Sequence, residues 1–304
     1  MNQKTALRVN VASFALLIFC AAASAQTRVV MLGTGTPHPS PEMSGPATAI
    51  VVGARAYLVD FGPGVIRRAE AAVEKGISPL DPAKITVAFV THLHSDHTAG
   101  LPDLILTPWV MGRTQLDIYG PEGTEEMTRD VLAAWRQDIE IRTKGLEHRP
   151  PQTVRAHDVK PGVVYRDDKV KVTAFRVSHG DWPQAFGYRF DTPDRSIVIS
   201  GDTRPGPELE ANCKPCDVMI HEAYSPSSTV SSMPDWKTYR ARYHTSTEQL
   251  AQIASRTRPG LLIIYHVSGR GPGPGGQTPD EQLLREVHKG YTGRVVVGHD
   301  LDVF

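Results

Sequence analysis

The sequence has little cysteine and no excess of charge of either sign. Its 304 residues include 3 cysteines, and 33 basic side chains balance 33 acidic ones. So little cysteine excludes a disulfide-rich scaffold. A net charge of zero removes the positive field that holds a nucleic acid through its phosphates, so we expect no nucleic-acid partner. With 40% hydrophobic residues, the chain can still bury a large core.

Only one long hydrophobic run occurs, and it lies at the N-terminus. Two basic residues precede the apolar stretch from Val9 to Ala22, and the small residues Ala23-Ser24-Ala25 follow it. This order is typical of a secretory signal peptide, whereas a membrane span needs about 20 apolar residues. We therefore expect a cleaved signal peptide over residues 1–25, one domain over residues 26–304, a periplasmic or secreted location and no stable membrane anchor.

Two cysteines follow the signal peptide, Cys213 and Cys216. In an exported chain, oxidising conditions allow them to form a local disulfide. Two free thiols and a redox motif are the alternatives, and the spacing leaves them open. A zinc ribbon is excluded, because it needs a second cysteine pair.

The rest of the chain alternates short β-rich runs with helical patterns. The β-rich runs predict strands at residues 28–32, 47–52, 56–61, 85–90, 116–119, 170–177, 186–190, 196–200, 218–220, 261–265 and 295–297. The helical patterns cover residues 65–75, 125–139, 247–255 and 280–288. Strands in hairpin and crossover settings, with helices between them, predict one α/β domain with mixed sheets and outer helices.

The strongest chemical signal is the segment Thr91-His92-Leu93-His94-Ser95-Asp96-His97, directly after a predicted strand. Residues two apart on an extended chain point to the same side, so His92 and His94 can bind one ion. Asp96 and His97 can face a second position where the chain turns. By chance, this pattern of three histidines and an aspartate is expected on the order of once in a thousand chains of this composition. It therefore indicates a metal site.

These residues alone cannot hold two ions, so further ligands are expected downstream. Three candidates follow predicted strands, namely His179, Asp202 and His266. Loops at the ends of strands build the sites of α/β domains, so these side chains can converge on the same edge.

Taken in this order, the motifs resemble those of the metallo-β-lactamase superfamily. The resemblance is to its tRNase Z and arylsulfatase-like branch, and it is carried further by the segments 32–37, 100–103, 119–121, 221–223 and 244–246. It covers nearly all of the chain after residue 25. It implies an αββα sandwich of two mixed β-sheets with outer helices.

The resemblance also implies roles for the site residues. One metal ion would be bound by His92, His94 and His179. The other would be bound by Asp96, His97 and His266, and Asp202 would bridge the two. Glu222 and His244 would act together on the leaving-group side, and with Asp96 they form the set of catalytic candidates.

Zinc suits such a set of ligands, because it accepts neutral imidazoles and carboxylates and keeps one position open for water in catalytic sites. Two ions roughly 3.5 to 4 Å apart can hold a bridging hydroxide, since they lower the pKa of bound water to about 7. We therefore expect two Zn²⁺ ions, for which Mn²⁺ or Fe²⁺ could substitute. Such a centre needs no side-chain nucleophile, and the sequence has no Gly-x-Ser-x-Gly motif.

Other candidates are open to two interpretations. Asp60 resembles the family's buried aspartate that orients a metal-binding imidazole, but it could be an ordinary turn residue. Trp182 could line the pocket or belong to the core. The remaining histidines lack motif context and are assigned to the surface or core: His38, His148, His157, His288 and His299.

The predicted activity is hydrolysis of small-molecule esters by an exported dinuclear zinc enzyme, with phosphodiesters or aryl sulfates as the first hypothesis. A β-lactamase or lactonase is the alternative. Cleavage of tRNA 3′ ends ranks lower, because only 22 residues separate His179 from Asp202, too few for the inserted arm that the resemblance to bacterial tRNase Z implies. A metal-binding scaffold without turnover, a redox di-iron centre and a homodimer are further hypotheses. The di-iron centre is disfavoured, because His94 stands where that branch has a glutamate.

Overall fold

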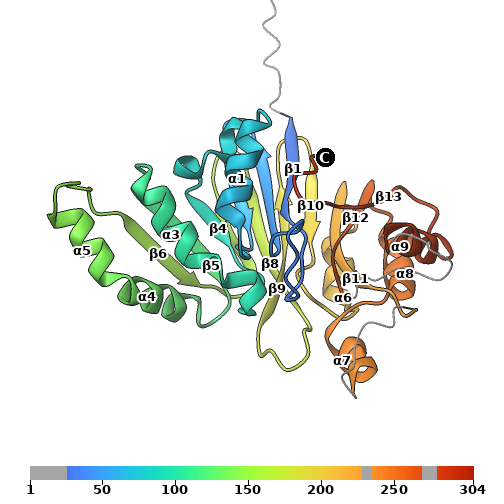
Figure 1. Cartoon of the computed structure of the whole chain (residues 1–304). Helices are drawn as coiled ribbons and strands as arrows, with labels where there is room; N and C mark the ends of the chain where they lie inside the picture. The colour runs from blue at the N-terminus through green and yellow to red at the C-terminus, as the bar shows by residue number, and fades with distance from the viewer. Residues whose placement is uncertain (1–25, 228–234, 269–278) are drawn as a thin grey trace, which may run out of the picture.

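The computed structural model describes residues 26–227, 235–268 and 279–304, so the predicted signal peptide lies outside the described residues. Two mixed β-sheets lie face to face, with helices on the outer side of each (Figure 1). The strands are β1 (Thr27–Gly33), β2 (Ala47–Val52), β3 (Arg55–Val59), β4 (Val87–Phe89), β5 (Gln115–Gly120), β6 (Thr153–Asp158), β7 (Gly162–Arg166), β8 (Lys171–Val177), β9 (Ala185–Asp191), β10 (Ser196–Ile199), β11 (Val218–Tyr224), β12 (Leu261–Ser268) and β13 (Val295–Val297). The predicted αββα sandwich is confirmed.

The two sheets are built in a similar way. The first has the order β1-β2-β3-β4-β5-β6, antiparallel from β1 to β3 and parallel from β3 to β6. The second has the order β13-β12-β11-β10-β9-β8-β7, antiparallel from β7 to β10 and parallel from β10 to β13. In each parallel region the carboxyl ends of neighbouring strands meet at one edge, where their loops can form a common site.

The core has three layers of buried side chains, which follow from the alternation along each strand. In β1, Val29 and Met31 pack between the two sheets, whereas Val30 and Leu32 pack under the outer helices. Both faces of the strand are therefore buried, which explains why its sequence is a continuous apolar run rather than an alternating one. A third layer lies on the outer side of the second sheet, under the C-terminal helices.

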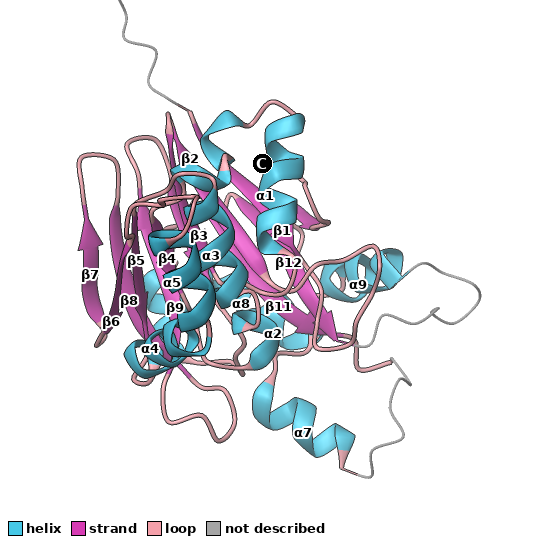
Figure 2. Cartoon of the chain, turned by 60° about the vertical axis from the view of Figure 1, so that its left-hand side comes forward, coloured by secondary structure: helices cyan, strands magenta, loops and turns pink. Residues whose placement is uncertain are grey.

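Two groups of helices cover the sheets (Figure 2). The helices are α1 (Val65–Glu74), α2 (Ser95–Thr98), α3 (Leu101–Val110), α4 (Thr124–Ala134), α5 (Arg136–Lys144), α6 (Pro207–Asn212), α7 (Trp236–Tyr243), α8 (Thr247–Thr257) and α9 (Pro279–His288). In both views α7 projects from the body of the fold. Among the described helices, none is long and apolar enough to cross a membrane.

One predicted helix is divided in the structure. Residues 125–139 were expected to be continuous, but α4 ends at Ala134 and α5 begins at Arg136. The first part packs against β6 and buries Thr124 and Thr128, whereas α5 buries no residue. Burial is therefore greater along α4, although Ile139 of α5 also packs against the core.

Cys213 and Cys216 form a disulfide at the end of α6, and both side chains are buried in the third core layer. Of the three interpretations that the sequence left open, the structure has the local disulfide.

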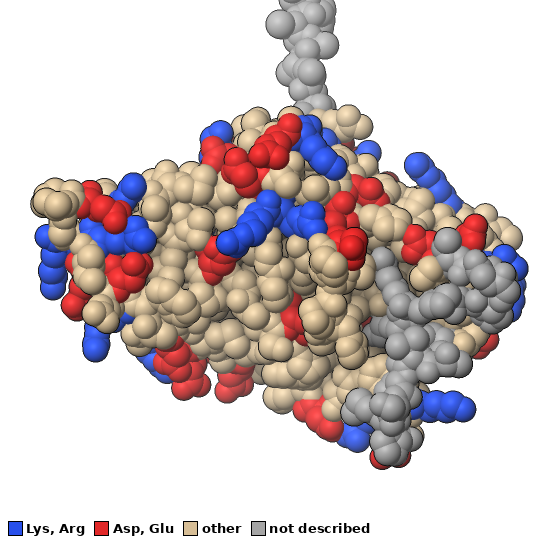
Figure 3. Space-filling model, in the orientation of Figure 1, with Lys and Arg blue, Asp and Glu red and all other residues tan. Residues whose placement is uncertain are grey.

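The molecular surface carries mixed charge. On the face shown in Figure 3, basic and acidic side chains are interspersed.

Candidate metal centre

The loop between β4 and α2 carries the histidine-rich motif. His92 and His97 are fully buried, and Asp96 is 7% exposed. Nε2 of His92 lies 2.9 Å from Nδ1 of His94, so the two side chains point to the same place, as their spacing predicted. Asp96 and His97 lie in the short helix α2, which turns their side chains toward a neighbouring position.

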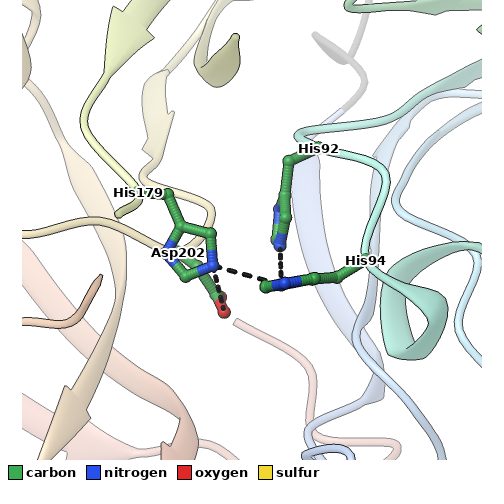
Figure 4. A group of neighbouring side chains, drawn as sticks. All are labelled: His92, His94, His179 and Asp202. Atoms are coloured by element: carbon green, nitrogen blue, oxygen red, sulfur yellow. Dashed lines mark hydrogen bonds and ion pairs between the residues drawn. The ribbon is translucent and has the colours of Figure 1, made fainter. Parts of the chain in front are cut away.

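The first group of ligand atoms comes from both sheets (Figure 4). His179 follows β8, and its Nε2 lies 3.1 Å from Nδ1 of His94. Asp202 follows β10, and its Oδ2 lies 3.8 Å from Nε2 of His179. One ligand atom from each of His92, His94, His179 and Asp202 lies within 4.8 Å of the others. Residues that are far apart in the sequence thus meet at one point.

The second group consists of Asp96, His97 and His266. Nε2 of His266 lies 3.1 Å from Oδ2 of Asp96, and the rings of His97 and His266 are stacked with centroids 5.1 Å apart. Asp202 reaches this group too, because its Oδ1 lies 3.4 Å from Nε2 of His97 and its Oδ2 lies 3.6 Å from Nε2 of His266. Its carboxylate therefore lies between the two groups.

His266 is positioned by an irregularity in β12. The sequence placed it after a strand ending at residue 265, but β12 continues to Ser268. Tyr265 pairs with Glu222 and Val267 pairs with Ala223, so His266 is the extra residue of a bulge, with φ 46°. A bulge re-aims a side chain, which explains how a residue inside the strand reaches the metal centre.

The donor set of these two groups fits divalent cations. Burial, together with the neighbouring histidines, lowers the pKa of His94 and of His179 to about 4, so both rings are neutral at pH 7. Neutral imidazole nitrogens that converge at hydrogen-bond distance need a cation or a proton between them. Nε2 of His97 and Oδ1 of Asp202 are also buried without a hydrogen-bond partner among the described residues. Imidazole nitrogens with carboxylate oxygens are the ligands that zinc prefers.

The outward-facing nitrogens of two histidines are held by the surrounding chain. Nδ1 of His97 lies 2.9 Å from Oδ2 of Asp60, whose other oxygen accepts the backbone N–H of Thr91 at 2.8 Å. Nδ1 of His179 lies 2.8 Å from the carbonyl oxygen of Tyr243. Such contacts orient imidazole ligands in metal centres. Asp60 thus contacts the motif histidine, as the sequence suggested.

Glu222 and His244 lie beside the two groups. Oε1 of Glu222 is 3.2 Å from Nδ1 of His244, and Nδ1 of His244 is 4.0 Å from Oδ2 of Asp202. Burial alone would lower the pKa of His244, but the charge and hydrogen bond of Glu222 and the charges of Asp202 and Asp96 raise it to about 9. This ring can therefore carry a proton at neutral pH while it lines the cavity.

A cavity of about 160 Å³ opens onto the centre. Its lining residues are Thr36, Pro37, His38, His94, Ser95, Asp96, Asp202, Trp236, Tyr239, His244 and His266. His38, which we assigned to the surface or core, lies in this lining, as do Trp236 and Tyr239, which no sequence motif surrounds. Trp182 is absent from this lining, and its indole Nε1 lies 2.8 Å from Nε2 of His94 instead.

Comparisons with known proteins support the same interpretation. Residues 55–267 match the β-lactamase superfamily domain. A protein named ribonuclease Z from Mycobacterium bovis is 32% identical over 280 residues, covering 90% of this chain and 96% of that protein. In fold, the chain is similar to the metallo-β-lactamase fold protein YhfI from Bacillus subtilis, with a TM-score of 0.67, 17% identity and coverage of 92% and 99%. It is also similar to the short form of human tRNase Z, with a TM-score of 0.64, 23% identity and coverage of 91% and 98%.

The relatives contradict our expectation of no nucleic-acid partner, because proteins named ribonuclease Z and tRNase Z are among them. The similarity to ribonuclease Z spans nearly all of both chains, and an alignment of 280 residues at this coverage leaves no room for a long arm that this chain lacks. The short separation between His179 and Asp202 is therefore no argument against cleavage of tRNA 3′ ends. The net charge of zero was also a weak argument, because cations bound at the site can neutralise a phosphate locally.

Proposed function

Because the chain belongs to the metallo-β-lactamase superfamily of metal-dependent hydrolases, we propose that it hydrolyses phosphodiester bonds with two divalent cations, most simply Zn²⁺, held in this centre. The observation that carries the proposal is the Glu222–His244 pair, which lies beside the candidate metal ligands and reaches the cavity.

The position of His244 suits a general acid. Its Nδ1 faces Glu222, so Nε2 is the ring nitrogen left to meet a ligand in the cavity. The departing oxygen of a phosphodiester with an alkyl or ribose leaving group is strongly basic, and a proton donor at that oxygen accelerates its departure by roughly 10² to 10⁴. Glu222 would hold the ring in place and balance its positive charge.

Glu222 is itself held in one orientation. Its Oε1 accepts the backbone N–H groups of Thr203 at 3.2 Å and Thr245 at 3.1 Å. These contacts tie it to the loop that carries Asp202 and to the segment that carries His244. The acid and the metal ligands therefore keep a constant spacing.

We assign the metal ligands as the resemblance to the metallo-β-lactamase superfamily implied. His92, His94 and His179 would hold one cation, Asp96, His97 and His266 would hold the other, and Asp202 would contact both. When bound, the cations supply an activated water as nucleophile and balance the charge of the phosphoryl oxygens. The side chains of this chain supply orientation, the leaving-group proton and exclusion of bulk water.

The names of the relatives extend the proposed substrate range to RNA. Proteins named ribonuclease Z share 31% to 36% identity with this chain, and a ribonuclease hydrolyses phosphodiester bonds. Both a small diester and an RNA chain present the same reacting group to the centre.

A panel of substrates tests the proposal on zinc-loaded protein. It consists of bis(4-nitrophenyl) phosphate, an RNA with an extended 3′ end, an aryl sulfate, a cephalosporin and a lactone. We expect turnover of at least one phosphodiester at a kcat/KM well above that for the other ester classes, and loss of that turnover with a chelator. Turnover of the sulfate, cephalosporin or lactone without any phosphodiester would refute the proposal.

A further inference from the structure

Helix α7 places three aromatic rings in a row beside the centre. Trp236, Tyr239 and Tyr243 follow one another at positions i, i+3 and i+7, which lie on one face of a helix. The rings of Trp236 and Tyr239 are inclined by only 7° with centroids 5.2 Å apart, and those of Tyr239 and Tyr243 by 17° at 4.4 Å. We call these three residues the aromatic row.

The inner end of the aromatic row is fastened to the metal centre. The hydroxyl of Tyr243 donates to Asp181 at 2.7 Å, and the ring lies against Gly180 so closely that no Cβ would fit there. The carbonyl oxygen of Tyr243 faces Nδ1 of the ligand candidate His179. A shift of the row would therefore disturb His179.

The outer end of the row is also held in place. The guanidinium of Arg240 lies 4.9 Å from the ring centroid of Trp236 and 5.3 Å from that of Tyr224 on β11. The row is thus fixed at both ends. Its side chains therefore lose little conformational entropy when a ligand binds against them.

Trp236 and Tyr239 line the cavity, and Tyr239 lies next to the candidate acid, with ring centroids 5.7 Å from His244. The row is therefore on the leaving-group side of the proposed reaction. Among the described residues that line the cavity there is no lysine or arginine, so this part of the wall offers aromatic carbon rather than fixed positive charge.

Trp236 also has an unused hydrogen-bond donor. Its Nε1 is buried and has no hydrogen-bond partner among the described residues. A buried donor without an acceptor is costly, and an acceptor on a ligand would satisfy it. Aromatic neighbours together with an unpaired N–H suit a flat ring that carries acceptor atoms or an electron-rich face.

We propose that Trp236 and Tyr239 form a subsite for a planar aromatic group, a nucleobase or an aryl ring, on the leaving-group side of the hydrolysed ester. This inference rests on the proposed function, because the ring belongs to the ester that the centre cleaves. Trp236 and Tyr243 lie on either side of Tyr239 along the helix, so the ligand ring meets mainly the edges of the row. Edge-to-face contacts are favourable, because ring edges are positive and ring faces negative.

Binding to the full zinc-loaded chain tests this subsite, measured by calorimetry with two matched ligand pairs. Adenosine 5′-monophosphate is compared with ribose 5-phosphate, and phenyl phosphate is compared with methyl phosphate. We expect the ring-bearing member of at least one pair to bind about tenfold more tightly than its ring-free partner. An advantage in the first pair identifies a nucleobase subsite, and one in the second pair identifies an aryl subsite.

Variants then test whether the tighter binding of the ring-bearing ligands depends on the aromatic row. Tyr239→Leu and Trp236→Leu should each reduce it to about threefold or less, while binding of the ring-free ligands stays within about twofold of the wild type. Tyr239→Phe keeps the ring and should keep the advantage. Trp135→Leu removes an exposed tryptophan that does not line this cavity and should also keep it.

The inference would be overturned if both members of each pair bound equally to the wild type. It would also be overturned if the ring-bearing ligand still bound more tightly in both leucine variants. A parallel loss of binding of the ring-free ligands would overturn it too, since it would indicate a structural role for the row. Because the readout is binding, a protein that keeps the ring advantage but hydrolyses no phosphodiester would refute the proposed function alone.

Discussion

Oε1 of Glu222 lies 3.2 Å from Nδ1 of His244, although Glu222 belongs to β11 and His244 directly follows α7. Both side chains are almost completely buried beside the candidate metal ligands. Since Nδ1 is turned toward Glu222, the opposite nitrogen of His244 is the one available to the cavity. In the proposed reaction His244 would donate the proton and Glu222 would orient its ring.

Replacing His244 should affect substrates according to their leaving groups. His244→Ala should lower kcat/KM by roughly 10² to 10⁴ for diesters with alkyl leaving groups, because these need a proton at the departing oxygen. Nitrophenyl esters need no such proton and should lose far less. The measurement is kcat/KM across a series of leaving-group pKa values. Equal losses across the series, with metal content unchanged, would exclude the role of general acid.

Asp202 is expected to contact both cations, because its two oxygens face histidines of the two groups. Asp202→Ala should abolish activity and reduce the metal content of the purified protein, which elemental analysis measures. Asp130→Ala, at an exposed position on α4, is the matched control and should leave both unchanged. Two tightly bound ions together with full activity in Asp202→Ala would contradict the assignment.

Asp60 should act on the metal centre through His97. The residue has φ 61°, a conformation that asparagine tolerates, and Asp60→Asn can keep the contact with the N–H of Thr91. Because an amide supports the metal-binding tautomer of His97 less well than a carboxylate, metal affinity should fall about 10- to 100-fold. Titration against a competing chelator measures this affinity, and an unchanged value would show that Asp60 is only a turn residue.

Part of the pH dependence of stability should come from Asp117, whose contribution is lost at low pH. The hydrogen bond from Arg155, with smaller contributions from Gln115 and His157, lowers the pKa of Asp117 to about 2 even though burial opposes this. An aspartate with a lowered pKa in the folded state stabilises the protein at pH values above its pKa in the unfolded chain, which is near 3.9. This stabilisation is lost as the pH falls toward 2.

Asp117→Asn should therefore lower the free energy of unfolding by about 1 kcal/mol or less at pH 6, since Arg155 is half exposed, and by progressively less between pH 4 and pH 2. Urea unfolding of metal-free protein measures the difference, because acid also removes metal by protonating histidines. A difference that does not shrink with falling pH would contradict the assigned cause.

The N-terminal segment should be removed when the chain is exported. We expect cleavage after Ala25 and an oxidised Cys213–Cys216 pair in protein recovered outside the cytoplasm. Intact-mass measurement with and without a reductant checks both. An intact N-terminus on protein that accumulates in the cytoplasm would show that residues 1–25 are not a signal peptide.

Several strands with a strong apolar pattern were predicted from the sequence, and polar peripheral elements were not. The apolar helix α3 was also missed. The strand at residues 295–297 has the predicted bounds, whereas β6, with the sequence TVRAHD, was not predicted. Most residues of β6 are half-buried or exposed, so its alternation is weak and its pairing with β5 defines it. Helix α7 was missed for the same reason, because Arg240 is its one buried residue.

The spacing of His92, His94, Asp96 and His97 predicts a metal site from the sequence alone, because these ligand candidates are close neighbours along the chain. What surrounds them depends on the tertiary structure. His38 and His148 are equally unremarkable in the sequence, yet only His38 lines the cavity. Trp236 and Tyr239 join it from a helix almost 200 residues further along the chain. The physical reason is that a short motif sets the position of adjacent ligands, whereas the walls of a pocket are formed by packing between segments that share no local signal.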